Sequence, residues 1–221
     1  MRQTRVVDMP ASAFFHMVGD PDTFVGGGSV AALTGAAAGS TALLVMRLNA
    51  RRKSLARHRP TVETAIRETE HIVDACADAA DADIRILDEL LIAHRQARAT
   101  GDQALYVAAL TAAAESTLRI AELVVDLLTR IDEQVDISSR FTVSDLGAAA
   151  VLAAGSGQAA LLTAEVNVAL LLEHDAANRP SALELDARHH DLRQKTIALG
   201  QRIERRTRVR LKGSEGMEGS T

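Results

Sequence analysis

The chain has almost no aromatic side chains: Phe, Tyr and Trp together make up 2% of its 221 residues, and Trp is absent. It also has a single cysteine, Cys76, and only four prolines. One cysteine excludes an internal disulfide and a zinc site built from several cysteines, and it fits the reducing setting of the cytoplasm. The apolar residues, 47% of the chain, are mostly Ala, Leu and Val. We expect a core of closely spaced backbones, because small side chains fill little volume.

Long stretches rich in Ala, Leu, Arg and Glu favour helix on intrinsic propensity. No segment shows the sustained alternation of apolar and polar residues that marks a strand. We therefore predict an all-α fold, a bundle of about six helices. The first is a short helix after Pro10 that directs Phe14, Phe15 and Val18 inward, and the others are expected at residues 29–57, 60–99, 102–134, 144–174 and 181–210. Residues 1–212 form one domain in this prediction, and the polar, Gly-rich residues 213–221 form a disordered tail.

Two of these helices contain long segments without charge, residues 25–46 and 146–164. Each is close to the roughly 20 residues that cross a bilayer. Their residues are mostly Ala, Gly, Ser and Thr, which are too weakly apolar to drive insertion. We predict two central helices buried on nearly all sides within the bundle, and no membrane contact. A chain of this size cannot easily cover both helices by itself, so we expect a homodimer.

The charge balance argues against a nucleic-acid partner, because the formal net charge is −4. Basic residues cluster locally in segments 47–57 and 202–210, which we interpret as solvated helix ends. Residues 1–20 contain no apolar run long enough for a signal peptide, which agrees with a cytoplasmic location. The seven histidines occur mostly singly. The adjacent pair His189 and His190 points to different helix faces, so we expect no metal ion.

Three glycines and a serine, Gly26 to Ser29, open the first uncharged helix. Glycine reaches backbone conformations that other residues avoid, and it lets a ligand lie against the backbone. A helix start also exposes unpaired N–H groups, where the helix dipole favours an anion. Two interpretations stay open: the run binds a carboxylate or phosphate, or it caps a helix and permits close packing.

A second polar junction, at Ser144 and Asp145, opens the other uncharged helix. Thr142 and Asp145 have the spacing of a capping box, so the junction either only starts a helix or also presents polar atoms to a pocket. Asp83 is a third candidate, in mid-helix beside an apolar face of Ile84, Leu87 and Leu91. The residues alone favour a surface position for Asp83. A buried Asp83 would have a raised pKa and would suit general acid/base catalysis.

Together, the GGGS loop before a helix, the acid in the third helix and an "SD-x-G-x-A" sequence opening a late Ala-rich helix resemble the cyclodeaminase/cyclohydrolase family. This family includes the formiminotetrahydrofolate cyclodeaminase domain and methenyltetrahydrofolate cyclohydrolase. The resemblance covers residues 5–210. It implies an all-helical, dimeric enzyme that acts on the bridge between two nitrogens of tetrahydrofolate. Such an enzyme adds water to a methenyl carbon, or closes the ring and expels ammonia from a formimino group. A tetrahydrofolate derivative would be the substrate, with no tightly bound cofactor.

The resemblance also implies roles for residues at matching positions. Asp83 and Asp145 are the implied acid/base residues. Arg52 and Lys53 lie where the family carries lysines, and they would receive the carboxylates of the folate tail or complement a helix dipole. The other implied binding residues come from the glycine loop and the late helix: Gly26, Gly27, Gly28, Ser29, Ser144 and Asn167.

Several family positions carry different residues in this chain. Thr23-Phe24-Val25 replaces a Pro-Thr-Pro sequence, and expected asparagines are replaced by Arg47, Ser139, Phe141 and Thr163. We predict that Phe24 and Phe141 line one pocket with Asp83, Asp145 and the glycines, within one chain or across a dimer, and bind a planar ligand. That ligand would be smaller or flatter than a full folate. Each Phe packs only against its own helix in the alternative interpretation. A non-catalytic relative, whose helical dimer binds another ligand or partner, is the alternative function.

Overall fold

The computed structural model describes residues 5–174 and 179–212, which form helices and no strand. Two 3-10 segments, η1 (Val6–Asp8) and η2 (Lys53–His58), accompany the helices α1 (Ala11–Gly19), α2 (Gly27–Arg51), α3 (Arg59–Thr100), α4 (Ala104–Gln134), α5 (Val143–His174) and α6 (Arg179–Lys212). The predicted all-α fold is confirmed. The predicted tail, residues 213–221, lies outside the described residues.

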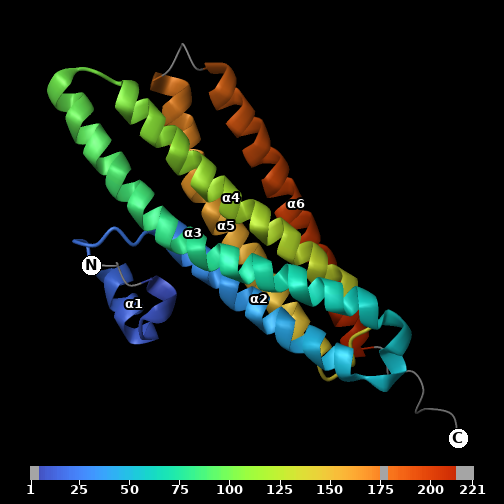
Figure 1. The fold of residues 1–221 in the computed structure, drawn as a ribbon. Coiled ribbons are helices and arrows are strands. Elements are labelled where there is room, and N and C mark those ends of the chain that lie inside the picture. The colour runs from blue at the N-terminus through green and yellow to red at the C-terminus, as the bar shows by residue number, and fades with distance from the viewer. Residues whose placement is uncertain (1–4, 175–178, 213–221) are drawn as a thin grey trace, which may run out of the picture.

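Helices α2 to α6 lie lengthwise in an elongated bundle, and the short α1 packs beside it near the N-terminal end of α2 (Figure 1). Helix α5 contacts α2, α4 and α6, and α2 contacts both α3 and α5. The turn between α3 and α4, with Gly101 in the left-handed conformation at φ 78°, lies at one end of the bundle. The η2 segment and the turn between α4 and α5 lie at the other end, so the start of α2 and the start of α5 are far apart.

Two features of the N-terminal half differ from the sequence prediction. Helix α2 ends at Arg51, not near residue 57, because residues 53–58 form a 3-10 segment in which Leu55 is non-helical. Pro60 then falls in the first turn of α3, where its missing N–H is tolerated. In α1, Phe14 is buried but Phe15 is 70% exposed and Val18 is also exposed. A nine-residue helix packed on one side buries only one of these faces.

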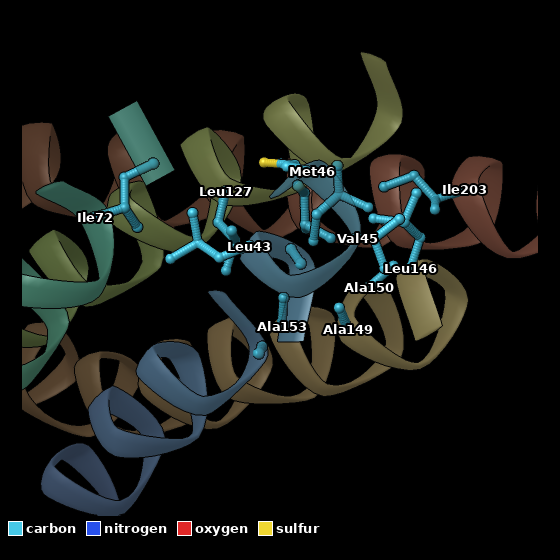
Figure 2. Packing of buried hydrophobic residues seen from close by; sticks show 14 of the residues in the cluster. Leu43, Val45, Met46, Ile72, Leu127, Leu146, Ala149, Ala150, Ala153 and Ile203 are labelled. Atoms are coloured by element: carbon cyan, nitrogen blue, oxygen red, sulfur yellow. The ribbon is translucent and has the colours of Figure 1, made fainter. Parts of the chain in front are cut away.

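Close backbone packing defines the core. Figure 2 shows Leu43 of α2 beside Leu127 of α4, and Val45 of α2 facing Leu146 and Ala150 of α5, with Ile203 of α6 next to Leu146. A Cβ atom added at Gly39 would lie 2.6 Å from a methyl of Val73, and one added at Gly157 would lie 2.9 Å from a methyl of Val124. The expected tight packing of small residues is therefore present.

Helices α2 and α5 are long and apolar enough to cross a membrane by length and composition, and 61% and 56% of their apolar windows are buried within the bundle. The sequence predicted that both helices are buried on nearly all sides, and within one chain this prediction is wrong. Leu44 of α2 is exposed, and on α5 Leu162 is 66% and Val166 is 60% exposed. The uncovered parts of both helices carry exposed large apolar side chains, among polar ones such as Ser40 and Gln158.

Candidate functional site

A pocket of about 370 Å³ lies where the start of α2 meets α3, α4 and α5. Its walls are mostly apolar, from Ile86, Leu87, Leu90, Ala113, Leu162 and Val166. Its polar groups are Asp83, Thr117, Thr163 and Asn167, and the backbone of Gly26, Gly27 and Gly28 forms one side. Among the described residues no Lys or Arg lines this pocket. One carboxyl group in such a setting is the main candidate for chemistry.

Asp83 is 8% exposed and accepts a 2.7 Å hydrogen bond at Oδ2 from the Ser29 hydroxyl. Burial raises the pKa of the Asp83 carboxyl, and hydrogen bonds from the hydroxyl and the backbone N–H of Ser29 partly oppose this. No cationic side chain contributes to this balance. The carboxyl therefore holds its proton to a higher pH than an exposed Asp does.

The surface position that the residues alone favoured for Asp83 is wrong. The apolar face was judged from Ile84, Leu87 and Leu91, but Leu91 is exposed and the buried residues of α3 include Cys76, Ala80 and Asp83. These three follow a helical spacing of four and three positions. Asp83 stays in this face because Ser29, which lies 54 positions away in the sequence, supplies its hydrogen bonds.

The glycine run makes room for that contact. A Cβ atom added at Gly28 would lie 2.7 Å from Asp83 Cγ and still closer to Oδ1, and one added at Gly27 would lie 3.3 Å from Thr163 Oγ1. Neither glycine has a positive φ, so close approach is the reason for glycine here. The protein's own Asp83 carboxyl group approaches the start of α2, where the sequence suggested an anionic ligand. Ser29 is fully buried behind Asp83 and does not line the pocket.

Asn167 is 9% exposed and contributes the only amide among the described residues that line the pocket. Thr117 and Thr163 donate hydrogen bonds to the carbonyls of Ala113 and Ala159 within their own helices. Their lone pairs are left for a ligand. Thr117 was missed by the sequence analysis, although a Thr among the buried Leu and Ala residues of α4 was a possible signal.

The other predicted site residues do not reach this pocket within one chain. Ser144 and Asp145 are at the start of α5. Asp145 precedes Thr163 of the pocket by 18 positions, which is about 27 Å along a helix. Phe141 precedes them and is 91% exposed, whereas Phe24 is 36% exposed beside the glycine run but outside the pocket lining. The length of α5 separates the two rings. A common pocket for Phe24, Phe141 and Asp83 is therefore not formed by one chain.

The basic residues proposed for a folate tail are also distant. Arg52 and Lys53 follow α2, whose 25 residues from Gly27 span about 37 Å. Arg52 instead donates a 2.8 Å hydrogen bond to the carbonyl of Ile137. Arg47 is exposed and pairs with Glu70 at 2.7 Å. These basic residues belong to the opposite end of the bundle.

Comparison with known proteins agrees with this architecture. A crystal structure of formiminotetrahydrofolate cyclodeaminase from Thermotoga maritima is similar, with a TM-score of 0.76 at 20% sequence identity, over 94% of this chain and 98% of that chain. At this identity the likeness shows a shared fold. Curated proteins give no match. The family model described as formiminotransferase-cyclodeaminase matches residues 10–182, and since this is most of the sequence, the chain belongs to that family.

Proposed function

We propose that the chain is an enzyme that makes or breaks a C–N bond in a small cyclic substrate with a one-carbon unit between two nitrogens. The substrate is a tetrahydrofolate derivative or a smaller heterocycle. The observation that carries the proposal is Asp83, a buried carboxyl with a raised pKa that opens into an apolar pocket. A carboxyl whose pKa is raised by burial suits general acid catalysis better than an exposed Asp does.

The proposed step uses the Asp83 proton directly. The second nitrogen of the substrate attacks the formimino carbon, a new C–N bond forms, and the proton on the attacking nitrogen moves to the imine nitrogen, which becomes an amino group. Asp83 then gives its proton to this amino group, the bond between the carbon and the amino group breaks, and ammonia leaves. The positive charge is shared over the N–C–N unit, beside the newly formed Asp83 carboxylate. This charge pair stabilises the product side of the reaction because the surroundings are apolar.

The other pocket residues fit supporting roles in this proposal. Asn167 presents an amide that donates to or accepts from a heterocyclic ring, and Thr117 and Thr163 offer acceptor oxygens. Leu87, Leu162 and their apolar neighbours surround the reacting carbon with apolar surface. The step needs no further cofactor, because Asp83 supplies the proton.

The pocket favours a ligand without an anionic tail. The carboxylates of a folate tail are bound best by Lys or Arg, and no described Lys or Arg lines the pocket. The apolar walls instead match a flat, uncharged ring. We therefore propose a heterocycle smaller than a full folate as the preferred ligand.

Thermal-shift measurements test this preference. We expect small N-heterocycles with an N–C–N unit to raise the melting temperature of the chain more than tetrahydrofolates with their tail carboxylates. A ligand at a hundred times its Kd adds about 2.7 kcal/mol to the free energy of unfolding. Stronger stabilisation by the tailed folates would contradict the proposed ligand. Stabilisation without any turnover would favour the alternative of a non-catalytic binding protein.

We also propose a homodimer, supported by the exposed large apolar residues of α2 and α5. We define the α2–α5 face by its exposed large apolar residues Leu44, Leu48, Val151, Leu152, Leu162 and Val166. No charged residue occurs in α5 between residues 146 and 164. Apolar surfaces of this kind mark protein interfaces. Because Leu162 and Val166 also line the pocket, a second copy on this face would close the open side of the site.

A two-fold symmetric dimer through this face would place the start of one α5 helix, with Ser144 and Asp145, near the pocket of the other chain. Gly155 is exposed on α5, 11 positions after Ser144 and 11 before Val166. An added Cβ at Gly155 meets no atom within 4 Å, so another helix has room to approach. Two α5 helices crossing antiparallel near Gly155 would bring Ser144 and Asp145 of the partner subunit toward this pocket. In this proposal, both junctions identified in the sequence serve one site.

The substitution Leu152→Glu tests the dimer. It puts a charge at the centre of the α2–α5 face, and we expect light scattering at micromolar concentration to shift from a dimer to a 23.5 kDa monomer. Leu105→Glu, at an exposed position of α4 away from this face, should leave the dimer intact. A wild-type chain that is already monomeric, or equal dissociation by both variants, would refute the proposed interface.

A further inference from the structure

Three metal-ligating side chains gather on α6, away from the pocket. One ligand atom from each of Asp186, His189 and His190 lies within 4.8 Å of the others. The spacing of three and four positions puts both histidines one turn after Asp186. They flank it on the helix surface. The sequence argument against a metal considered only how the histidines are spaced, and did not consider that Asp186 lies between the directions of His189 and His190.

His189 is held in an orientation that suits a ligand. Its side chain is buried at 4% exposure, and Nε2 lies 3.2 Å from the carbonyl oxygen of Leu161 on α5. A carbonyl only accepts, so Nε2 carries the proton and Nδ1 keeps its lone pair. Metal-binding histidines are commonly fixed in this way, with the second ring nitrogen donating to a carbonyl or carboxylate.

The surrounding charges leave the three side chains available. Arg188 pairs with Glu122 and Lys195 pairs with Asp191, each at 2.7 Å. Among the described residues Asp186 forms no ion pair of its own. His190 is exposed, so its ring is free to turn and the cluster is open to solvent. Bonds of about 2.0–2.2 Å to Zn²⁺ require the three ligand atoms to converge on one point, and the exposed His190 ring has room to turn toward it.

We propose that α6 binds one divalent transition-metal ion of the Zn²⁺ type through Asp186, His189 and His190, with water completing its coordination. Two imidazoles and a carboxylate are ligands that such ions accept well. The proposed ion would also fix α6 against α5, because His189 links the two helices through Leu161. This site is independent of the proposed reaction at Asp83.

Calorimetric titration of the purified, chelator-treated full chain with Zn²⁺ tests the site. We expect one ion per chain in a saturable transition. His190→Ala should weaken this binding at least about tenfold, since even residues that only support a ligand contribute that much. His71→Ala is the matched control: His71 is an exposed histidine on α3 with Asp74 one turn later, and its removal should change nothing.

Asp186→Asn provides a second measurement, because both Asp186 and His190 are accessible and their substitution leaves the buried His189 in place. It should weaken Zn²⁺ binding and reduce the rise in melting temperature on adding Zn²⁺. No saturable binding by the wild-type chain would overturn the proposal. Equal weakening by His190→Ala and His71→Ala would do so as well, because it would show adsorption to scattered histidines.

Discussion

Replacing Asp83 with Asn is expected to lower turnover by about 10²–10⁴-fold, the usual effect of losing a positioned general acid or base. Asn has nearly the same shape, and its Oδ1 still accepts the hydrogen bond that the Ser29 hydroxyl now gives to Asp83. The variant keeps the pocket but has no proton to transfer. The loss should appear in kcat with the best substrate from the thermal-shift series.

The same substitution is expected to stabilise the fold at neutral pH. Burial raises the pKa of Asp83, so the folded state holds this proton more tightly than the unfolded chain. Stability therefore falls as the pH rises from about 3.9, the value of an exposed Asp, to the raised folded value. Asn does not titrate, so the variant does not lose this stability as the pH rises. The variant should melt above the wild type at pH 7, by about 2–4 °C for each kcal/mol gained, and this advantage should disappear in acid.

Asp74→Asn is the matched control, because Asp74 is an exposed carboxylate on the same helix. It should leave turnover unchanged. A fully active Asp83→Asn variant would show that the carboxyl takes no part in the reaction. An inactive variant that is also unfolded would show a structural role instead, which is why melting and kcat are measured on the same samples.

Gly28→Ala is expected to reduce turnover by about 10²-fold, the lower end of the range for Asp83→Asn. The added methyl would lie 2.7 Å from Asp83 Cγ and closer to Oδ1, so the carboxyl or the start of α2 has to move. Displacing a catalytic group by an ångström costs on the order of 10²-fold in rate. Gly19→Ala is the control, since an added Cβ there meets nothing within 4 Å.

The double variant Gly28→Ala/Asp83→Asn separates the two effects. If the alanine acts by displacing the Asp83 carboxyl, adding it to Asp83→Asn should cost little further activity, because the two changes remove the same interaction. Losses that multiply would contradict this coupling and would give Gly28 a separate role in the pocket.

Composition and periodicity predicted the helices well because each depends on nearby residues. The ends were less predictable: α2 stops at Arg51, where a run of basic residues and Pro60 compete with continued helix. Which face of α3 is buried depended on Ser29, a contact between distant segments. Local apolar spacing therefore favoured the wrong position for Asp83.

The candidate site was predictable for the residues that the family resemblance placed near the start of α2. The glycine run, Asp83 and Asn167 meet at one pocket, in agreement with the family resemblance. Asp145 and Phe141 do not, because a motif match carries no information on helix length between two motifs, nor on which copy of the chain contributes each one. Leu162 and Val166 are exposed beside the pocket, and they belong to the α2–α5 face through which we propose that a second copy binds.

The most direct test of catalysis at Asp83 follows ammonia release from a formimino substrate by the purified full chain. Tetrahydrofolate carrying the formimino group and an analogue without the anionic tail are compared, with Asp83→Asn and Asp74→Asn beside the wild type. We expect ammonia and ring closure in equal amounts, a higher kcat/KM for the tail-less analogue, and loss of both products only in Asp83→Asn. Equal rates for the wild type and a folded Asp83→Asn variant with both substrates would contradict catalysis by this pocket.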